Sequence, residues 1–244
     1  MSIRLHNDSI VAELPFEYYD ALYSFKDYLA ESKLLKHEIL ERVPKAKTLL
    51  DVACGSGKHL EQFRTWINAE GIDFDPSQVR NARQRLQDIP VHQGDMRDFN
   101  LGKTFDVVTC LFSAIGYMNN PKDLDTAVSN MARHLNPGGL LLVEPWLTPD
   151  RYQAGGVYSL NVDEPNLKIT RMNITELVEG RTVMKMHYMV GTPQGISTFE
   201  EVLDFGLYGP EQYVTAVKKA GLEGMWQDGG PTGRGLVIGI KANE

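Results

Sequence analysis

Short apolar segments alternate with amphipathic ones between residues 48 and 144, and this alternation constrains the fold more than any other feature of the sequence. The apolar, β-like segments predict strands at 48–53, 69–73, 90–93, 105–112 and 140–144. The segments between them predict helices at 58–66, 77–86 and 124–135. Strands that alternate with helices form βαβ units. The sequence therefore predicts an α/β fold with a parallel sheet.

The pattern changes after Pro145. Short alternating stretches, separated by Gly and Pro, predict strands at 168–171, 183–190 and 197–205. A helix is then expected at 210–220, followed by two last strands at 222–227 and 235–241. We therefore expect an antiparallel sheet inserted after the fifth parallel strand.

Three parts follow from this reading. Residues 1–46 form an N-terminal helical cap, with one or two amphipathic helices between 15 and 42. The core comprises 47–149 and 208–244, and the insert comprises 150–207. Because exposed strand edges pair readily, the insert is either a lid over the substrate or the interface of a homodimer.

Charge and composition exclude several classes of protein. The 244 residues carry 32 acidic and 25 basic side chains, a net charge of −7, whereas binding a phosphate backbone requires a basic surface. Nucleic acid is therefore not the expected partner. No apolar run approaches the roughly 20 residues of a membrane span, and Met1–Ile10 lacks the apolar region of a signal peptide. We expect a cytoplasmic protein without a membrane partner.

The two cysteines, Cys54 and Cys110, occur without a CxxC motif or a zinc-like spacing of His and Cys. The sequence predicts that both are buried thiols and that the protein has no metal site.

Residues 49–60 read LLDVACGSGKHL, a buried strand that enters a Gly-rich turn and then a helix. Gly55 and Gly57 let the backbone approach a ligand closely, and a helix N-terminus offers unpaired N–H groups. Asp73 ends the next strand, where its carboxylate can accept hydrogen bonds from ribose hydroxyls. This arrangement indicates a nucleoside cofactor. The dinucleotide fingerprint has a third Gly where this chain has Leu60, which disfavours NAD.

Several motifs together resemble the class I S-adenosylmethionine-dependent methyltransferases. They are Asp51, the two glycines, Asp73, GDMRDF at 94–99 and PGG at 137–139. The resemblance covers residues 15–241. It implies a Rossmann-like, seven-stranded, mostly parallel sheet with helices on both faces, and S-adenosyl-L-methionine as the cofactor.

A narrower resemblance concerns the acceptor. The sequence is similar to bacterial dTDP-3-amino-3,6-dideoxyhexose N,N-dimethyltransferases of the desosamine and mycaminose type. The similar strings are GDMRDF, CLFSAIGYM at 110–118, VEPW at 143–146 and GGPTGRGL at 229–236. This resemblance implies N-methylation of a small nucleotide-linked amino sugar.

The resemblance also implies roles for the residues of the cofactor site. Asp51 would orient the loop or the methionine ammonium, and Ala53 and Gly55 would present backbone to the methionine. Asp73 would accept hydrogen bonds from the ribose. The remaining cofactor candidates are Gly57 in the turn, Asp95 and Met96 at the adenine, Tyr19 closing over the cofactor, and Leu111 and Phe112 lining the channel to the acceptor.

At the acceptor, Tyr117 stands where the resembled enzymes have His. Tyrosine is a poor base at neutral pH, with a reference pKa near ~10. Tyr117 and Glu144 are the catalytic candidates, expected to guide an amine whose alignment supplies most of the rate. Arg234 would pair with a phosphate oxygen, a geometry that arginine suits. Further substrate-binding candidates are Ser113, Trp146 and His187.

Two other functions remain open on the sequence alone. The chain could methylate another small molecule, such as an amine, an amino acid or a phenol. It could also be a cofactor-binding subunit without catalysis. Replacing Arg234 distinguishes a pyrophosphate-bearing acceptor from a neutral one, because only binding of the first depends on the positive charge of Arg234.

Overall fold

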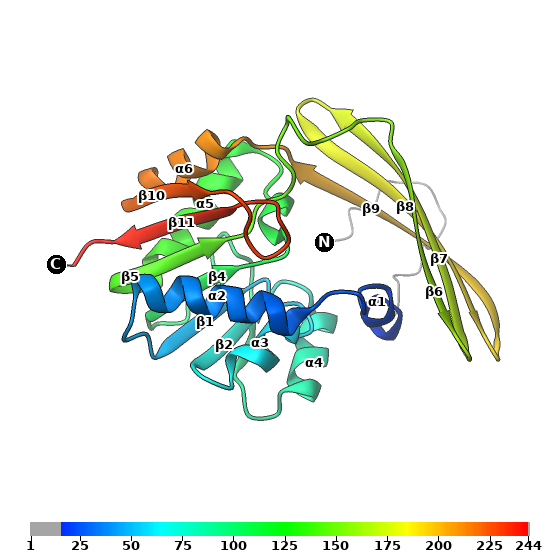
Figure 1. Ribbon diagram of the computed structural model, residues 1–244, viewed down its shortest axis with the longest axis horizontal. Coiled ribbons are helices and arrows are strands. Elements are labelled where there is room, and N and C mark those ends of the chain that lie inside the picture. Colours follow the sequence, from blue (N-terminus) through cyan, green and yellow to red (C-terminus); the bar gives the residue numbers. More distant parts are fainter. Residues whose placement is uncertain (1–15, 244) are drawn as a thin grey trace.

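The computed structural model describes residues 16–243, with side chains from Tyr18 onward. It contains a seven-stranded sheet covered by helices and a separate four-stranded sheet (Figure 1). Residues 1–15 of the predicted helical cap lie outside the described residues. The segment 1–10, on which the expected absence of a signal peptide rests, is among these residues.

The large sheet is parallel except at one strand. Its strands are β1 (Thr48–Val52), β2 (Asn68–Asp73), β3 (Val91–Gln93), β4 (Phe105–Cys110), β5 (Leu135–Val143), β10 (Leu222–Gln227) and β11 (Leu236–Lys241). Their order in the sheet is β10-β11-β5-β4-β1-β2-β3, and β11 runs antiparallel to both of its neighbours. This confirms the predicted Rossmann-like, mostly parallel sheet.

Helices cover both faces of this sheet, as expected. One face packs against α2 (Tyr28–Arg42), α3 (Lys58–Phe63) and α4 (Pro76–Arg85). The other packs against α5 (Pro121–Arg133) and α6 (Pro210–Lys219). Neighbouring residues of each strand point to opposite faces of the sheet. Leu49 therefore packs on the face covered by α2, α3 and α4, and Leu50 on the face covered by α5 and α6.

The fifth strand begins earlier than the sequence pattern predicted. The helix ends at Arg133 and the strand begins at Leu135, whereas we expected a helix to 135 and a strand from 140. The reason lies in PGG: Gly138 adopts a φ of +73° and the pairing with β4 shifts its register nearby. The glycines thus form a bulge within the strand instead of a loop before it.

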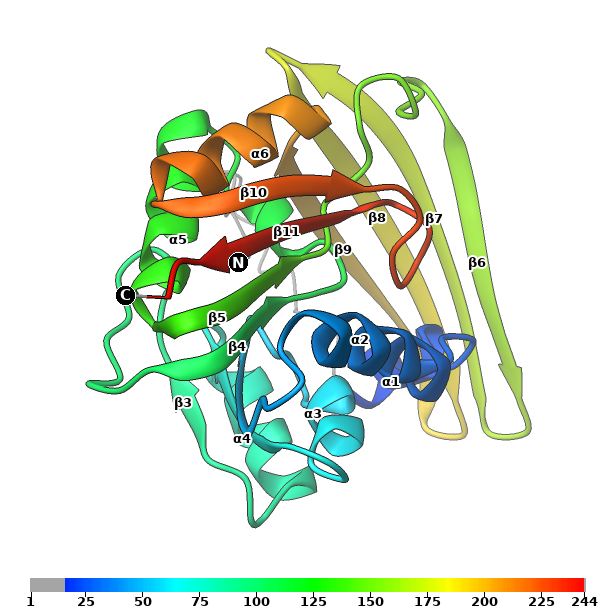
Figure 2. The ribbon, with the colours of Figure 1, turned by 60° about the vertical axis from the view of Figure 1, so that its left-hand side comes forward.

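The insert is an antiparallel sheet of four strands, which confirms the inserted sheet. They are β6 (Val157–Glu164), β7 (Leu167–Val178), β8 (Arg181–Thr192) and β9 (Gly195–Gly206), paired in chain order. The sequence analysis missed β6, an edge strand that is exposed along most of its length and therefore shows little apolar alternation. Figure 2 shows this sheet standing beside the core.

Helix α1 (Phe16–Leu22) connects the core to the inserted sheet (Figure 1). Leu22 packs against residues of β7 and β8, including Ile169. On the core side, the Asp20 carboxylate binds Lys58 at 3.0 Å and Arg85 at 2.5 Å. The helix therefore holds the inserted sheet over the ends of the core strands. None of the helices within 16–243 is long and apolar enough to cross a membrane.

Candidate active site

A cleft of about 2500 Å³ lies between the carboxyl ends of the core strands and the inner face of the inserted sheet. Ligands bind at this edge in open α/β sheets. The volume exceeds the roughly 300–1,000 Å³ of a pocket for one small ligand, so the cleft has room for two.

The Gly-rich turn forms the floor of the cleft. Ala53 and Gly55 have φ values of +57° and +55° and line the cleft with backbone. Gly57 does not line it. A Cβ at Gly57 would lie 2.6 Å from Leu86 Cδ1, so this glycine allows α3 to approach α4. Its place in the motif reflects helix packing rather than contact with a ligand.

Two carboxylates flank the turn. Asp73 accepts hydrogen bonds from the backbone N–H of Gly55 at 2.8 Å and of Asp75 at 2.9 Å. Asp51 is buried, and among the described residues its carboxylate accepts a hydrogen bond only from Thr109 Oγ1, at 2.7 Å. Burial raises the pKa of Asp51 to about 6. No Lys, Arg or His of residues 16–243 forms an ion pair with it, so Asp51 is suited to a cationic group of a ligand.

The segment after β3 brings Asp95 and Met96 to the cleft. Arg97 binds Asp95 at 2.5 Å and Asp123 at 3.1 Å. The hydrogen bonds from Arg97 hold the pKa of Asp95 below its usual value. Asp95 is therefore an ionised hydrogen-bond acceptor whose position is fixed by Arg97.

A turn after β4 brings Leu111, Phe112 and Ser113 into the cleft, as predicted for the strand's carboxyl end. Phe112 and Ser113 have φ values of +50° and +62°, which are unfavourable for residues with a side chain. The backbone N–H of Phe112 donates to Glu144 Oε2 at 2.7 Å. This bond helps to keep the turn in its strained conformation.

Glu144 is not placed to act on an amine. Its side chain is fully buried and does not line the cleft. While Oε2 accepts from Phe112, Oε1 accepts from the backbone N–H of Thr232 at 3.0 Å and from its hydroxyl at 2.5 Å. The catalytic role predicted for Glu144 is therefore wrong, since both oxygens connect the β4 turn to the loop between β10 and β11.

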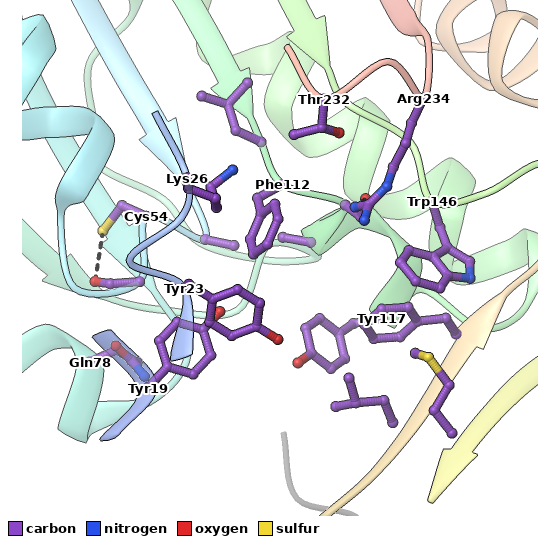
Figure 3. Close-up of a pocket in the computed structure, with 18 of the residues that line it drawn as sticks. Tyr19, Tyr23, Lys26, Cys54, Gln78, Phe112, Tyr117, Trp146, Thr232 and Arg234 are labelled. Carbon is purple, nitrogen blue, oxygen red and sulfur yellow. Dashed lines mark hydrogen bonds between the residues drawn. The ribbon is translucent and has the colours of Figure 1, made fainter. Parts of the chain in front are cut away.

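That loop places Arg234 in the wall of the cleft (Figure 3). Its Nη1 donates to Ser113 Oγ at 2.7 Å, and the guanidinium lies 4.9 Å from the Trp146 ring and 5.7 Å from the Phe112 ring. Within the described chain it has no ion pair with a carboxylate. Burial lowers the pKa of Arg234, which means that its charge is costly without an anion.

Aromatic side chains enclose the space between the turn and Arg234. Tyr19 comes from α1, Tyr23 from the turn that follows it, and Tyr117 from the short helix η1 (Ala114–Tyr117), with their rings facing the same space (Figure 3). Tyr23 packs edge-on against Phe112, with centroids 5.4 Å apart. Burial raises the pKa of Tyr19 and of Tyr117, so these phenols are neutral and cannot serve as bases near pH 7.

The other two substrate-binding candidates have different positions. Trp146 lines the cleft, and its indole N–H donates to Thr182 Oγ1 at 3.0 Å. His187 lies on the opposite face of the inserted sheet, where its side chain is 62% exposed and pairs with Glu200. Its neighbours Met186 and Tyr188 point inward, so strand alternation directs His187 away from the cleft. We therefore withdraw it as a substrate-binding residue.

Several lining residues were not predicted, among them Arg171, Glu201 and Lys26. Arg171 and Glu201 reach the cleft from β7 and β9, and their inward direction depends on a strand register that the sequence does not reveal. Lys26 also lines the cleft. Its ammonium lies 3.8 Å from the centre of the Phe112 ring and binds Glu31 at 2.7 Å. The sequence shows the spacing of Lys26 and Glu31, five residues apart, but their pairing and burial are seen only in the structure.

Comparisons with known proteins agree with this geometry. A family model described as "Methyltransferase domain" matches residues 49–139. The dTDP-4-amino-2,3,4,6-tetradeoxy-D-glucose N,N-dimethyltransferase of Saccharopolyspora spinosa is 39% identical over 91% of each chain. The dTDP-3-amino-3,4,6-trideoxy-alpha-D-glucopyranose N,N-dimethyltransferase of Streptomyces venezuelae is 38% identical over 89% of this chain and 92% of the relative.

A solved structure is similar over nearly the whole chain. It is S-adenosylmethionine-bound CalS10, an amino pentose methyltransferase from Micromonospora echinaspora. The TM-score is 0.85 at 36% identity, over 94% of this chain and 99% of the other.

Fold, cleft and comparisons together define an S-adenosylmethionine-dependent N-methyltransferase. More narrowly, the chain belongs to the family of the dTDP-amino-sugar N,N-dimethyltransferases. The resemblance and the cofactor predicted from the sequence are confirmed.

The residues of the cleft floor fit this cofactor. Asp51 is a buried carboxylate that has no ion pair with a cation of residues 16–243, which matches an ammonium group. Ala53 and Gly55 have no side chain larger than a methyl group, so a cofactor can approach their backbone closely. Asp73 retains acceptor capacity on both oxygens for the hydroxyls of a ribose.

Proposed function

We propose that this enzyme transfers methyl groups from S-adenosylmethionine to the amino group of a dTDP-linked amino sugar. The observation that carries the proposal is Arg234, a cation in the cleft wall that has no carboxylate partner within the described chain. A guanidinium pairs well with phosphate oxygens. The cleft also has the volume for a nucleotide sugar beside the cofactor.

In this proposal the floor of the cleft holds the cofactor. Asp51 binds the methionine ammonium, Asp73 binds the ribose hydroxyls, and Asp95 with Met96 holds the adenine. Tyr19 closes over the cofactor from α1. The cofactor supplies a methyl group that its sulfonium already activates.

The acceptor lies between the cofactor and the inserted sheet. Arg234 and Ser113 bind the pyrophosphate, and Trp146 packs beside it. Tyr117 orients the amine as a neutral hydrogen-bonding group. Holding the nitrogen lone pair in line with the methyl group contributes roughly 7–11 kcal/mol at best, so positioning is the main source of the rate.

We propose that two methyl groups are added in succession. The reaction space is enclosed by the rings of Tyr19, Tyr23, Phe112 and Tyr117. Aromatic faces attract alkylated ammonium groups, so a monomethylated product can stay for a second transfer. The relatives act on a 3-amino and a 4-amino sugar. Mass spectrometry of both products identifies the preferred position and the number of methyl groups.

We also propose the division into a cap (1–46), a core (47–149 and 208–244) and an insert (150–207). The inner face of the insert lines the cleft and acts as a substrate lid. Its outer face exposes Met172, Met189 and Ile196, to which a second copy of the chain would bind. We place this homodimer in the cytoplasm. Light scattering on the intact protein and on a Met189→Glu variant tests the dimer.

Calorimetric titration tests the proposed acceptor. The protein is first saturated with S-adenosylhomocysteine and then titrated with dTDP. We expect dTDP to bind to the wild type and the Arg234→Ala variant to lose most of that affinity. Absence of dTDP binding to the saturated wild type would favour an acceptor without a nucleotide. The small-molecule alternatives would then take its place.

A further inference from the structure

Strand β9 carries one acidic side chain, Glu201, that has no cationic partner within residues 16–243. Glu200 faces outward and pairs with His187, and the Asp204 carboxylate pairs with Arg181. For Glu201, no Lys, Arg or His nitrogen of residues 16–243 lies within 4.0 Å. A carboxylate in a cleft wall without a cation is suited to bind one from a ligand.

The position of Glu201 directs it toward the reaction space. It lies opposite Met186 on β8, and both residues line the cleft. The Tyr188 hydroxyl donates to Oε2 at 2.8 Å. Within the described chain, Oε1 has no hydrogen-bond partner. One oxygen is therefore anchored by the protein and the other is available to a ligand.

Three phenols face Glu201 from across the cleft: Tyr19 on α1, Tyr23 in the turn after α1, and Tyr117 on η1. The negative charge of Glu201 contributes to the raised pKa of each of them, after burial. Its electric field thus reaches the place where Tyr117 would hold the amine.

The reaction needs such a group. A primary amine is mostly protonated near neutral pH, and an ammonium ion has no lone pair with which to attack a methyl group. The buried phenols cannot accept its proton, and both oxygens of Glu144 are occupied. Among the described residues of β7, β8 and β9, Glu201 is the inward-facing carboxylate available for this role.

We propose that Glu201 binds the ammonium form of the acceptor and accepts one of its protons. This rests on the proposed function. The N–H bond breaks, its electron pair stays on nitrogen, and the carboxylate becomes a carboxylic acid. The lone pair then forms the N–C bond while the methyl–sulfur bond breaks, and sulfur keeps that electron pair. Glu201 then releases its proton to water. The methylated ammonium dissociates, or gives a proton to the ionised Glu201 before a second transfer.

Tyr188 is a positioning residue in this scheme. Its hydrogen bond fixes the Glu201 carboxylate without contact with the amine. Arg171, on the neighbouring strand, donates to the Tyr23 hydroxyl at 3.1 Å rather than to Glu201. It therefore leaves the carboxylate free for the substrate.

The test compares Glu201→Gln with Glu200→Gln, one residue away on the outer face. Turnover of a dTDP-amino sugar by the wild type is measured first, because its absence would refute the proposed function and not the role of Glu201. At pH 7 we expect Glu201→Gln to lower kcat/KM by at least about 30-fold and Glu200→Gln to leave it within twofold. Binding of plain dTDP, which has no amine, should not change in either variant.

The pH dependence separates proton transfer from a structural role. The groups facing Glu201 are Tyr19, Tyr23, Tyr117, Tyr188 and Arg171. The pKa of each of these tyrosines is raised, so none of the four tyrosines titrates between pH 7 and 9. An arginine side chain is not deprotonated in proteins.

We therefore expect kcat/KM of Glu201→Gln to rise with pH as the free amine deprotonates in solution, while the wild type stays nearly flat. Equal loss at every pH would overturn the proposal. If the variant folds poorly, the pH profile of the wild type tests the proposal by itself. An enzyme without a base loses about tenfold in kcat/KM for each pH unit below the pKa of the amine. That slope in the wild type would also overturn it.

Discussion

Glu144 and Thr232 lie 88 residues apart in sequence and share two hydrogen bonds. Glu144 Oε1 accepts from the backbone nitrogen of Thr232 at 3.0 Å and from its hydroxyl at 2.5 Å. Because Oε2 accepts from the N–H of Phe112, one buried side chain joins the turn after β4 to the loop between β10 and β11.

Replacing Glu144 should therefore affect structure before chemistry. In Glu144→Ala the buried N–H groups of Phe112 and Thr232 lose their acceptor, which costs roughly 2–4 kcal/mol of unfolding free energy. Denaturant unfolding measures this loss. Calorimetry should show a larger loss of affinity for dTDP than for S-adenosylhomocysteine, since Arg234 follows Thr232 closely. Unchanged stability together with lost turnover would instead restore Glu144 as a catalytic residue.

Arg234→Ala should weaken acceptor binding selectively. A charge-assisted hydrogen bond contributes about 1.5–3 kcal/mol, which corresponds to roughly 10- to 150-fold in Kd for dTDP. Affinity for S-adenosylhomocysteine should stay within about threefold. Arg64→Ala is the matched control, because Arg64 forms an exposed ion pair with Asp88 away from the cleft. Equal affinity of both variants for dTDP would show that Arg234 does not bind the pyrophosphate.

Cofactor binding should strengthen as the pH rises through about 6. Burial raises the pKa of Asp51 to about 6, and only the ionised form attracts the methionine ammonium. Titrations with S-adenosylmethionine at pH 5, 6 and 7 should show this increase in the wild type. In Asp51→Asn the affinity should be weaker and lack this step. A step of the same size in both proteins would assign it to another group.

The same group affects the stability of the cofactor-free protein with the opposite sign. The folded-state pKa of Asp51 lies above the unfolded value of about 3.9, so folding favours the protonated form. This contribution is complete below about pH 4 and is lost as the pH rises to about 6. At pH 7 Asp51→Asn should thus be more stable than the wild type, by up to roughly 3 kcal/mol. Thermal unfolding of both proteins at pH 7 measures the difference, and a less stable variant would contradict it.

Gly57→Ala should destabilise the fold more than it impairs cofactor contact. The new Cβ would lie 2.6 Å from Leu86 Cδ1, and φ is +81°. We expect a loss of about 2–3 kcal/mol, combining backbone strain with a steric clash. Gly102→Ala is the control, with a φ of +65° and no atom within 4 Å of the added Cβ, and should lose only about 1 kcal/mol. Equal losses in the two variants would show that packing against Leu86 contributes little.

The sheet and the cofactor loop could be predicted because their signals are local. A buried strand, a Gly-rich turn and an acid at the end of the next strand identify the positions of Gly55 and Asp73 without knowledge of distant contacts. The early start of β5 was missed since Gly138 permits a bulge inside the strand, which sequence alone reads as a loop.

The acceptor side depends on long-range pairing and was predicted less well. His187 and Glu201 sit on strands in which a shift of one residue exchanges the two faces. The register places His187 outside and Glu201 inside, and no local pattern distinguished them. Glu144 was misjudged for a related reason, because Thr232, which occupies its carboxylate, comes from a loop far along the chain.

The central claim is methylation of a nucleotide-linked amino sugar, and a turnover assay tests it most directly. The wild type is incubated with S-adenosylmethionine and a dTDP-3-amino or dTDP-4-amino sugar, and products are followed by mass spectrometry. We predict one and then two added methyl groups, with matching formation of S-adenosylhomocysteine. An intact dTDP-amino sugar, in a protein that still binds S-adenosylhomocysteine, would contradict the account.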